Sequence, residues 1–160
     1  MNLTVNDIRK YMKENNIDEN LDLNNPIKSL GILKIEKTNN NELWNVKTRG
    51  PKNSYYEKGV FIIEIDFKDF PSRPPKVRFK TRIIHLQCAN GRICTNFLSR
   101  SWEQSTTRLE ILVGLFLFLK IEDQCPCAPL DKAFIKIYVN DKEKYKKLVE
   151  YYCIEYAARS

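Results

Sequence analysis

The order in which hydrophobic patterns follow one another constrains the fold of this chain more than any other feature. Four short runs with strand-like composition come first, at residues 30–35, 43–48, 60–67 and 77–79, and a nearly continuous apolar run follows at 109–121. Strands that succeed one another without helices between them favour an antiparallel meander. The apolar run is shorter than the ~18 residues that a membrane-spanning helix needs, so it predicts a helix buried in the core.

Helical patterns stand on either side of this strand-rich part of the sequence. Residues 3–15 have an amphipathic pattern, and residues 132–139 and 141–158 predict two closing helices, the second capped by Asp141. A chain of 160 residues fits one domain. We therefore expect an α+β fold with a four-stranded antiparallel meander sheet, an N-terminal helix, a central buried helix and two C-terminal helices.

The bulk composition limits the classes of partner. A net charge of +7 favours acidic partners. The basic residues are scattered, however, with no run of five or six like charges and no interleaving of basic and aromatic residues for base stacking. We therefore expect neither a nucleic acid as the main partner nor a membrane.

The cysteine count indicates the redox environment. The chain has five cysteines, which is an odd number, and no basic start followed by an apolar stretch that would indicate a secretory signal. Both observations favour reduced thiols, and so a cytoplasmic or nuclear location.

One of these thiols lies where a nucleophile is expected. Residues 81–106 have little periodicity, and a connection of that length in a compact domain is usually functional. Cys94 follows an Asn90-Gly91 turn in this region, with His85 and side-chain amides nearby in sequence. A thiol on such a loop is a candidate nucleophile. The alternative, a buried structural cysteine, stays open on local spacing alone.

A series of different short motifs extends along nearly the whole chain in a specific order. They are Gly50-Pro51, Tyr56-Glu57-Lys58-Gly59-Val60-Phe61, Phe70-Pro71-Ser72-Arg73-Pro74-Pro75-Lys76-Val77, His85, Asn90-Gly91-Arg92-Ile93-Cys94, Trp102, Ala128-Pro129-Leu130 and Asp141 to Tyr145. Over roughly residues 3–158, this order and spacing resembles the ubiquitin-conjugating enzymes. The resemblance implies the fold described above and makes Cys94 the position that forms a thioester.

The resemblance also implies a reaction and a set of partners. An activating enzyme hands the C-terminal glycine of ubiquitin to Cys94, and a target lysine or a ligase cysteine then attacks the thioester. The implied partners are ubiquitin or a ubiquitin-like modifier, the activating enzyme, a ubiquitin ligase and a protein substrate. No cofactor or metal is expected on this chain, because ATP is used by the activating enzyme.

Several positions near the expected active site depart from the family pattern. His85-Leu86-Gln87 replaces the usual His-Pro-Asn, so Gln87 is the candidate amide that supports the oxyanion or the loop, and His85 is expected to anchor the loop. Asn96 stands where an acid is common, two residues after the cysteine, and Ala128 replaces an acid or serine. Such acids are linked to drawing or deprotonating the incoming lysine, so their absence argues against fast transfer to free lysine.

The first predicted helix resembles the surface that the family offers to the activating enzyme. Thr4 or Asn6 is its expected N-cap, and Arg9, Lys10 and Lys13 form its basic side. A plain solvated helix face is an equal alternative for these three cations.

The loops that face a ligase in this family also differ here. The family often has an aromatic residue between the prolines and Ser-Pro-Ala after the tryptophan. These differences argue against the standard docking of a RING ligase. The corresponding positions are Ser72, Glu103 and Gln104.

Three other interpretations remain open. The chain is either a catalytic conjugating enzyme or a variant that only binds ubiquitin, although such variants usually lack the cysteine. A ubiquitin-like modifier is an alternative cargo. Cys125 and Cys127 could approach Cys94 and Cys88 to form a disulfide switch, whereas zinc is disfavoured because Cys-x-Cys is not a usual structural zinc spacing.

Overall fold

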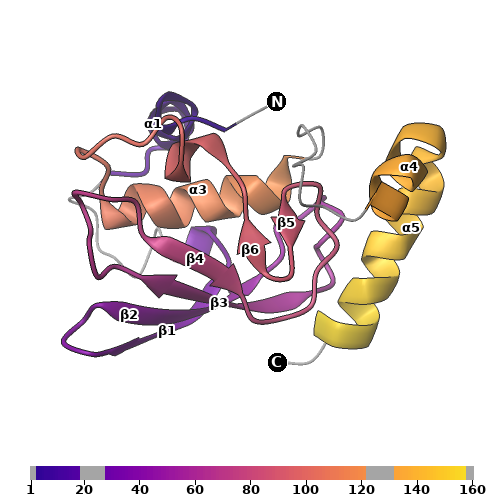
Figure 1. Cartoon of the computed structure of the whole chain (residues 1–160), viewed down its shortest axis with the longest axis horizontal. Coiled ribbons are helices and arrows are strands. Elements are labelled where there is room, and N and C mark those ends of the chain that lie inside the picture. The colour runs from indigo at the N-terminus through magenta and orange to yellow at the C-terminus, as the bar shows by residue number, and fades with distance from the viewer. Residues whose placement is uncertain (1–2, 19–27, 122–131, 158–160) are drawn as a thin grey trace.

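The sheet in this computed structural model, which describes residues 3–18, 28–121 and 132–157, is antiparallel throughout (Figure 1). Its strand order is β1-β2-β3-β4-β6-β5, so the first four strands form the predicted meander. A short hairpin, β5 and β6, extends it beyond four strands and was not predicted. The bounds are β1 Ile32–Thr38, β2 Leu43–Arg49, β3 Val60–Asp66, β4 Lys76–Phe79, β5 Cys88–Ala89 and β6 Arg92–Ile93.

The strands follow the alternation of buried and exposed side chains in the sequence. In β2, the residues at alternate positions, among them Trp44 and Val46, are buried, and β4 repeats this pattern with Val77. The prediction that the first strand begins at residue 30 was wrong by two residues. Gly31 has a φ of +76°, which places it in a turn, and β1 begins directly after it at Ile32.

The helix α3, Arg108–Lys120, confirms the predicted buried core helix. It crosses the sheet near the middle of the molecule (Figure 1), and nearly all of its side chains are buried. Its contact with α1, Val5–Glu14, is close: a Cβ atom on Gly114 would lie 2.6 Å from the Phe97 ring and 2.8 Å from Ile8 Cδ1. Among the described residues, no helix is both long and apolar enough to cross a bilayer.

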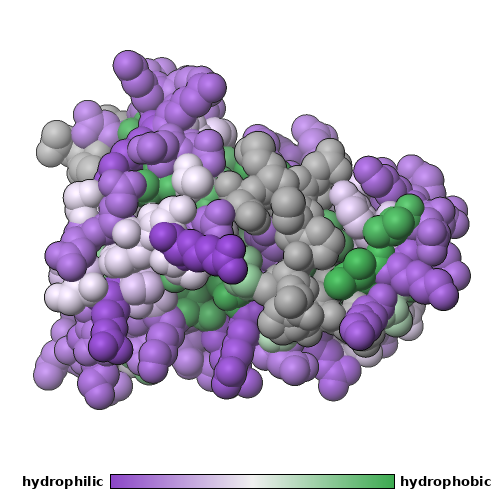
Figure 2. All heavy atoms as spheres, turned by 45° about the horizontal axis from the view of Figure 1, so that its top comes forward, coloured by the Kyte–Doolittle hydropathy of each residue, from purple (hydrophilic) through white to green (hydrophobic). Residues whose placement is uncertain are grey.

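The last two helices of the chain lie together at one end of the molecule (Figure 1). They are α4, Lys132–Asn140, and α5, Lys142–Tyr152, which continues as the π-helical turn η2, Cys153–Ala157. Thr4 caps α1 and Asp141 caps α5, as predicted. Hydrophobic side chains are exposed at the end of the molecule that contains α4 (Figure 2), where the side chain of Val139 is among the exposed ones.

Candidate active site

Cys94 lies directly after β6, where the chain leaves a two-residue hairpin. Asn90 and Gly91 form that turn with φ angles of +52° and +83°. Positive φ at both central positions is the geometry that Asn-Gly favours in hairpins, so the predicted turn is confirmed. The Cys94 N–H donates to the carbonyl of Gln87 at 2.7 Å, which fixes the backbone beside the thiol.

The exposure of the cysteines separates Cys94 from the others in the described part of the chain. Cys94 is exposed, whereas Cys88 and Cys153 are buried. Burial raises the pKa of both buried thiols to about 12, so they stay protonated at neutral pH and are poor nucleophiles. The interpretation of Cys94 as a buried structural cysteine is therefore wrong. The proposed switch partners Cys125 and Cys127 lie outside the described residues.

His85 lies beneath the Cys94 loop as a buried anchor. Its Nε2 lies 2.7 Å from the carbonyl oxygen of Phe118, and its Nδ1 accepts from the Gln87 N–H at 3.0 Å. These two bonds fit the neutral tautomer with the proton on Nε2. The ring also stacks on Phe118 at 3.8 Å between centroids. Burial lowers the pKa of His85 to about 4, so the ring is uncharged at neutral pH.

Gln87 links this anchor to the cysteine. Its N–H bonds to His85, its carbonyl bonds to Cys94, and the residue is only 2% exposed. Its buried side chain favours packing beneath the loop over direct contact with an oxyanion, which would form on the acyl oxygen of a group bound to the exposed sulfur. Asn96, by contrast, is partly exposed at the start of the 3-10 helix η1, Asn96–Leu98, two residues after the thiol.

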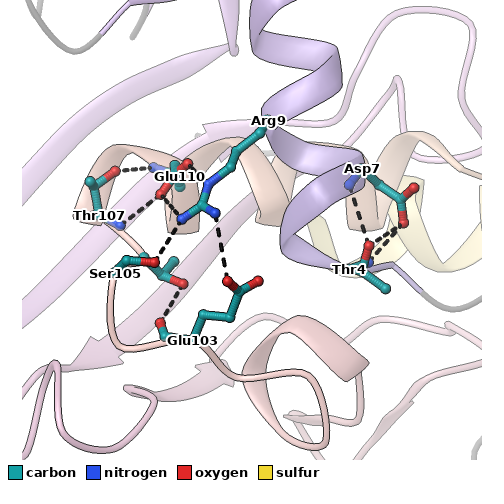
Figure 3. A network of polar contacts seen from close by, with 8 residues as sticks. Thr4, Asp7, Arg9, Glu103, Ser105, Thr107 and Glu110 are labelled. Carbon is teal, nitrogen blue, oxygen red and sulfur yellow. Dashed lines mark hydrogen bonds and ion pairs between the residues drawn. The ribbon is translucent and has the colours of Figure 1, made fainter.

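Arg9 joins the first helix to the segment that leads into α3. Its Nε donates to Glu110 Oε2 at 2.7 Å, its NH2 group donates to Ser105 Oγ at 3.1 Å, and its NH1 group lies 3.7 Å from Glu103 Oε1 (Figure 3). Glu110 also accepts from the Thr107 N–H at 2.9 Å and completes the capping box of α3.

This network changes how the predicted docking residues are understood. Arg9 was expected to face the activating enzyme, but its guanidinium forms an ion pair with Glu110 of the same chain. Lys10 and Lys13, by contrast, are exposed. Glu103, expected to face a ligase, is a partner of Arg9, so the two predicted surfaces are continuous. Sequence reasoning missed Glu110, although Thr107-x-x-Glu110 is the spacing of a capping box and was a usable signal.

The two loops predicted to face a ligase also meet. The Trp102 Nε1 donates to the Pro71 carbonyl at 3.1 Å, and the Trp102 ring contacts Phe70 at 6.0 Å between centroids. Ser72 and Gln104 are exposed beside these contacts. The candidate residues therefore form two groups, one around Cys94 and one around Arg9 and Trp102.

Comparison with known proteins assigns the class. The family model for ubiquitin-conjugating enzyme matches residues 12–153, which includes the whole Cys94 loop. The chain belongs to this family. A solved ubiquitin-conjugating enzyme E2 domain from Toxoplasma gondii has 25% sequence identity and a TM-score of 0.69. The match covers 82% of this chain and 91% of that one, so the fold is that of the E2 domain.

Proposed function

We propose that this chain accepts ubiquitin, or a ubiquitin-like modifier, from an activating enzyme as a thioester on Cys94, and passes it to a target lysine or a ligase cysteine. The observation that carries the proposal is the exposed thiol of Cys94, on a loop that His85 and Gln87 hold from below. We place this reaction in a reducing compartment, the cytoplasm or the nucleus.

The chemistry needs only groups of this chain and its partners. In loading, the Cys94 thiolate attacks the C-terminal carbonyl carbon of the modifier, a C–S bond forms, and the group that held the modifier on the activating enzyme leaves. In discharge to a substrate, the lysine amine attacks the same carbon. The C–N bond forms, the C–S bond breaks, Cys94 leaves as a thiolate, and the amine proton passes to solvent. ATP is consumed by the activating enzyme, so we expect no cofactor on this chain.

A loading assay tests the proposal. The protein is incubated with activating enzyme, ATP and a panel made of ubiquitin and ubiquitin-like modifiers. We expect one member to form an adduct that thiols reverse, that Cys94→Ala abolishes, and that Cys94→Ser converts to a more stable oxyester. Cys88→Ala, which changes a buried thiol, should keep the adduct. Non-covalent binding of ubiquitin without any adduct would instead identify a binding-only variant.

Gln87→Ala is expected to slow discharge by about tenfold while loading changes less, because the lost side chain leaves a cavity beneath the Cys94 loop and loosens the geometry for attack, even though the backbone bonds of this residue to His85 and Cys94 are kept. Gln87→Asn keeps the amide with one methylene less and should lie between the wild type and Gln87→Ala. Both steps can be timed on non-reducing gels in single-turnover reactions. Equal slowing of loading and discharge would refute a specific role for Gln87.

A further inference from the structure

The basic residues of β4 share one face of the sheet. Lys76 and Arg78 are exposed, whereas Val77 between them is buried. Lys80, directly after the strand, continues the alternation and is exposed as well. Because side chains in a strand alternate between its two faces, these three cations project to the same side, away from the core.

The neighbouring strand adds another cation to this face. Arg92 of β6 is the direct cross-strand partner of Arg78. Directly opposed residues of an antiparallel pair have Cα atoms about 4.5–5.5 Å apart, and like charges at such positions repel. Two arginines at opposed positions therefore lower the stability of the folded sheet. Such a local loss of stability is expected where function requires the positive charge.

One carboxylate of the described residues, that of Glu64, can offset only part of this positive charge. Glu64 lies opposite Arg78 on β3, but its carboxylate is 3.1 Å from Lys80 Nζ. The ion pairs of the described residues include neither Arg78 nor Arg92. Arg82 lies over the Tyr156 ring at 4.9 Å, and none of the ion pairs among the described residues includes it.

These arginines adjoin the candidate nucleophile. Cys94 follows Arg92 by two residues and is exposed like it, which places the two about 7 Å apart along an extended chain. On the other side, Arg78 and Arg82 line a hollow of about 780 Å³ between β4, the β5–β6 turn and the two C-terminal helices. The residues described along its wall include no Asp or Glu. We call Arg78, Arg82 and Arg92 the arginine cluster.

We propose that the arginine cluster docks an acidic segment of the substrate protein, with its carboxylates within about four residues of the lysine that receives the modifier. Guanidinium groups bind carboxylates in a two-pronged geometry, and an extended peptide advances about 3.3 Å per residue, so a short segment spans the distance from the cluster to Cys94. A nucleic acid is the other ligand that a basic face could bind, and the oligonucleotide competition described below distinguishes it from an acidic peptide. This inference rests on the proposed function.

The test uses two fluorescein-labelled peptides with one central lysine, flanked by glutamates in one and by glutamines in the other. Fluorescence anisotropy with the full-length protein should give about tenfold tighter binding for the glutamate peptide, with the preference decreasing as salt is added. The charge-removing pair Arg78→Gln and Arg92→Gln should reduce this ratio to about one. The pair Arg78→Lys and Arg92→Lys should restore part of it. In single-turnover discharge below saturation, the thioester should transfer to the glutamate peptide about tenfold faster.

The matched control is Arg49→Gln, compared with Arg92→Gln alone, because Arg49 is exposed on β2, outside the cluster, and each change removes one arginine charge. Equal binding of the two peptides would overturn the proposal. An equal loss of preference with Arg49→Gln would also overturn it, since the net charge alone would then explain the binding. The proposal would also be overturned if a single-stranded oligonucleotide of equal charge displaced the labelled glutamate peptide at a lower concentration than the unlabelled glutamate peptide does. The anisotropy measurement requires no thioester, so it tests docking of the peptide even if Cys94 is not loaded.

Discussion

Arg9→Ala is expected to lower the free energy of unfolding by about 2–3 kcal/mol, far more than an ordinary change on a helix surface. Its partner Glu110 has a side chain that is 8% exposed and receives the Arg9 Nε at 2.7 Å. Removing one member of a buried ion pair leaves the other charge without compensation, which costs about 3–5 kcal/mol when both are buried. The side chain of Arg9 is 37% exposed, so the expected loss is smaller.

Urea denaturation of Arg9→Ala, with controls on the same helix, measures this effect. Lys10→Ala and Lys13→Ala change exposed residues and should stay within about 0.5 kcal/mol of the wild type. Adding Glu110→Gln to Arg9→Ala should recover part of the loss, because a neutral glutamine can still serve the capping box with Thr107. A loss for Arg9→Ala no larger than that of the two lysine variants would contradict the structural role assigned to Arg9.

Most of the fold could be predicted because it depends on periodic burial. The pattern of residues 60–67 predicted the strand β3, Val60–Asp66, to within one residue, and the apolar run at 109–121 predicted α3, Arg108–Lys120. The hairpin of β5 and β6 was missed because each strand has two residues, too few to carry a pattern. Its turn, Asn90-Gly91, was visible because positive φ selects particular residue types.

The candidate site could be predicted only where one residue type carries the chemistry. Cys94 was identifiable from its motif, but exposure, the property that distinguishes it from Cys88, depends on tertiary packing. Likewise, Arg9 has the composition of a docking residue, and only the approach of α1 to α3 brings it to Glu110. That Arg78 and Arg92 lie opposite each other could not be predicted, because it depends on the strand register, which the sequence pattern did not specify.

The stability of the protein is expected to fall by about 3 kcal/mol between pH 6.5 and pH 4 through His85 alone. Burial lowers the pKa of this imidazole from 6.5 to about 4 in the folded chain. Between these values the unfolded chain binds a proton that the folded chain does not, so acid favours unfolding. The contribution of the neutral ring is fully present above pH 6.5 and is lost as the pH falls toward 4. A protonated ring could no longer accept from the Gln87 N–H at Nδ1, so the loss also acts on the Cys94 loop.

His85 is the one histidine of the sequence, so its titration can be followed by NMR without assignment of overlapping signals. We expect the Cε1–H shift of the folded protein to stay constant down to about pH 5 and to change only below it. A midpoint near 6.5 in the folded protein would contradict the buried, neutral ring. His85→Gln removes the titrating group and retains a donor for the Phe118 carbonyl, so its urea-unfolding free energy should depend less on pH across this window. Because acidic side chains also titrate at low pH, the difference between wild type and variant isolates the His85 contribution.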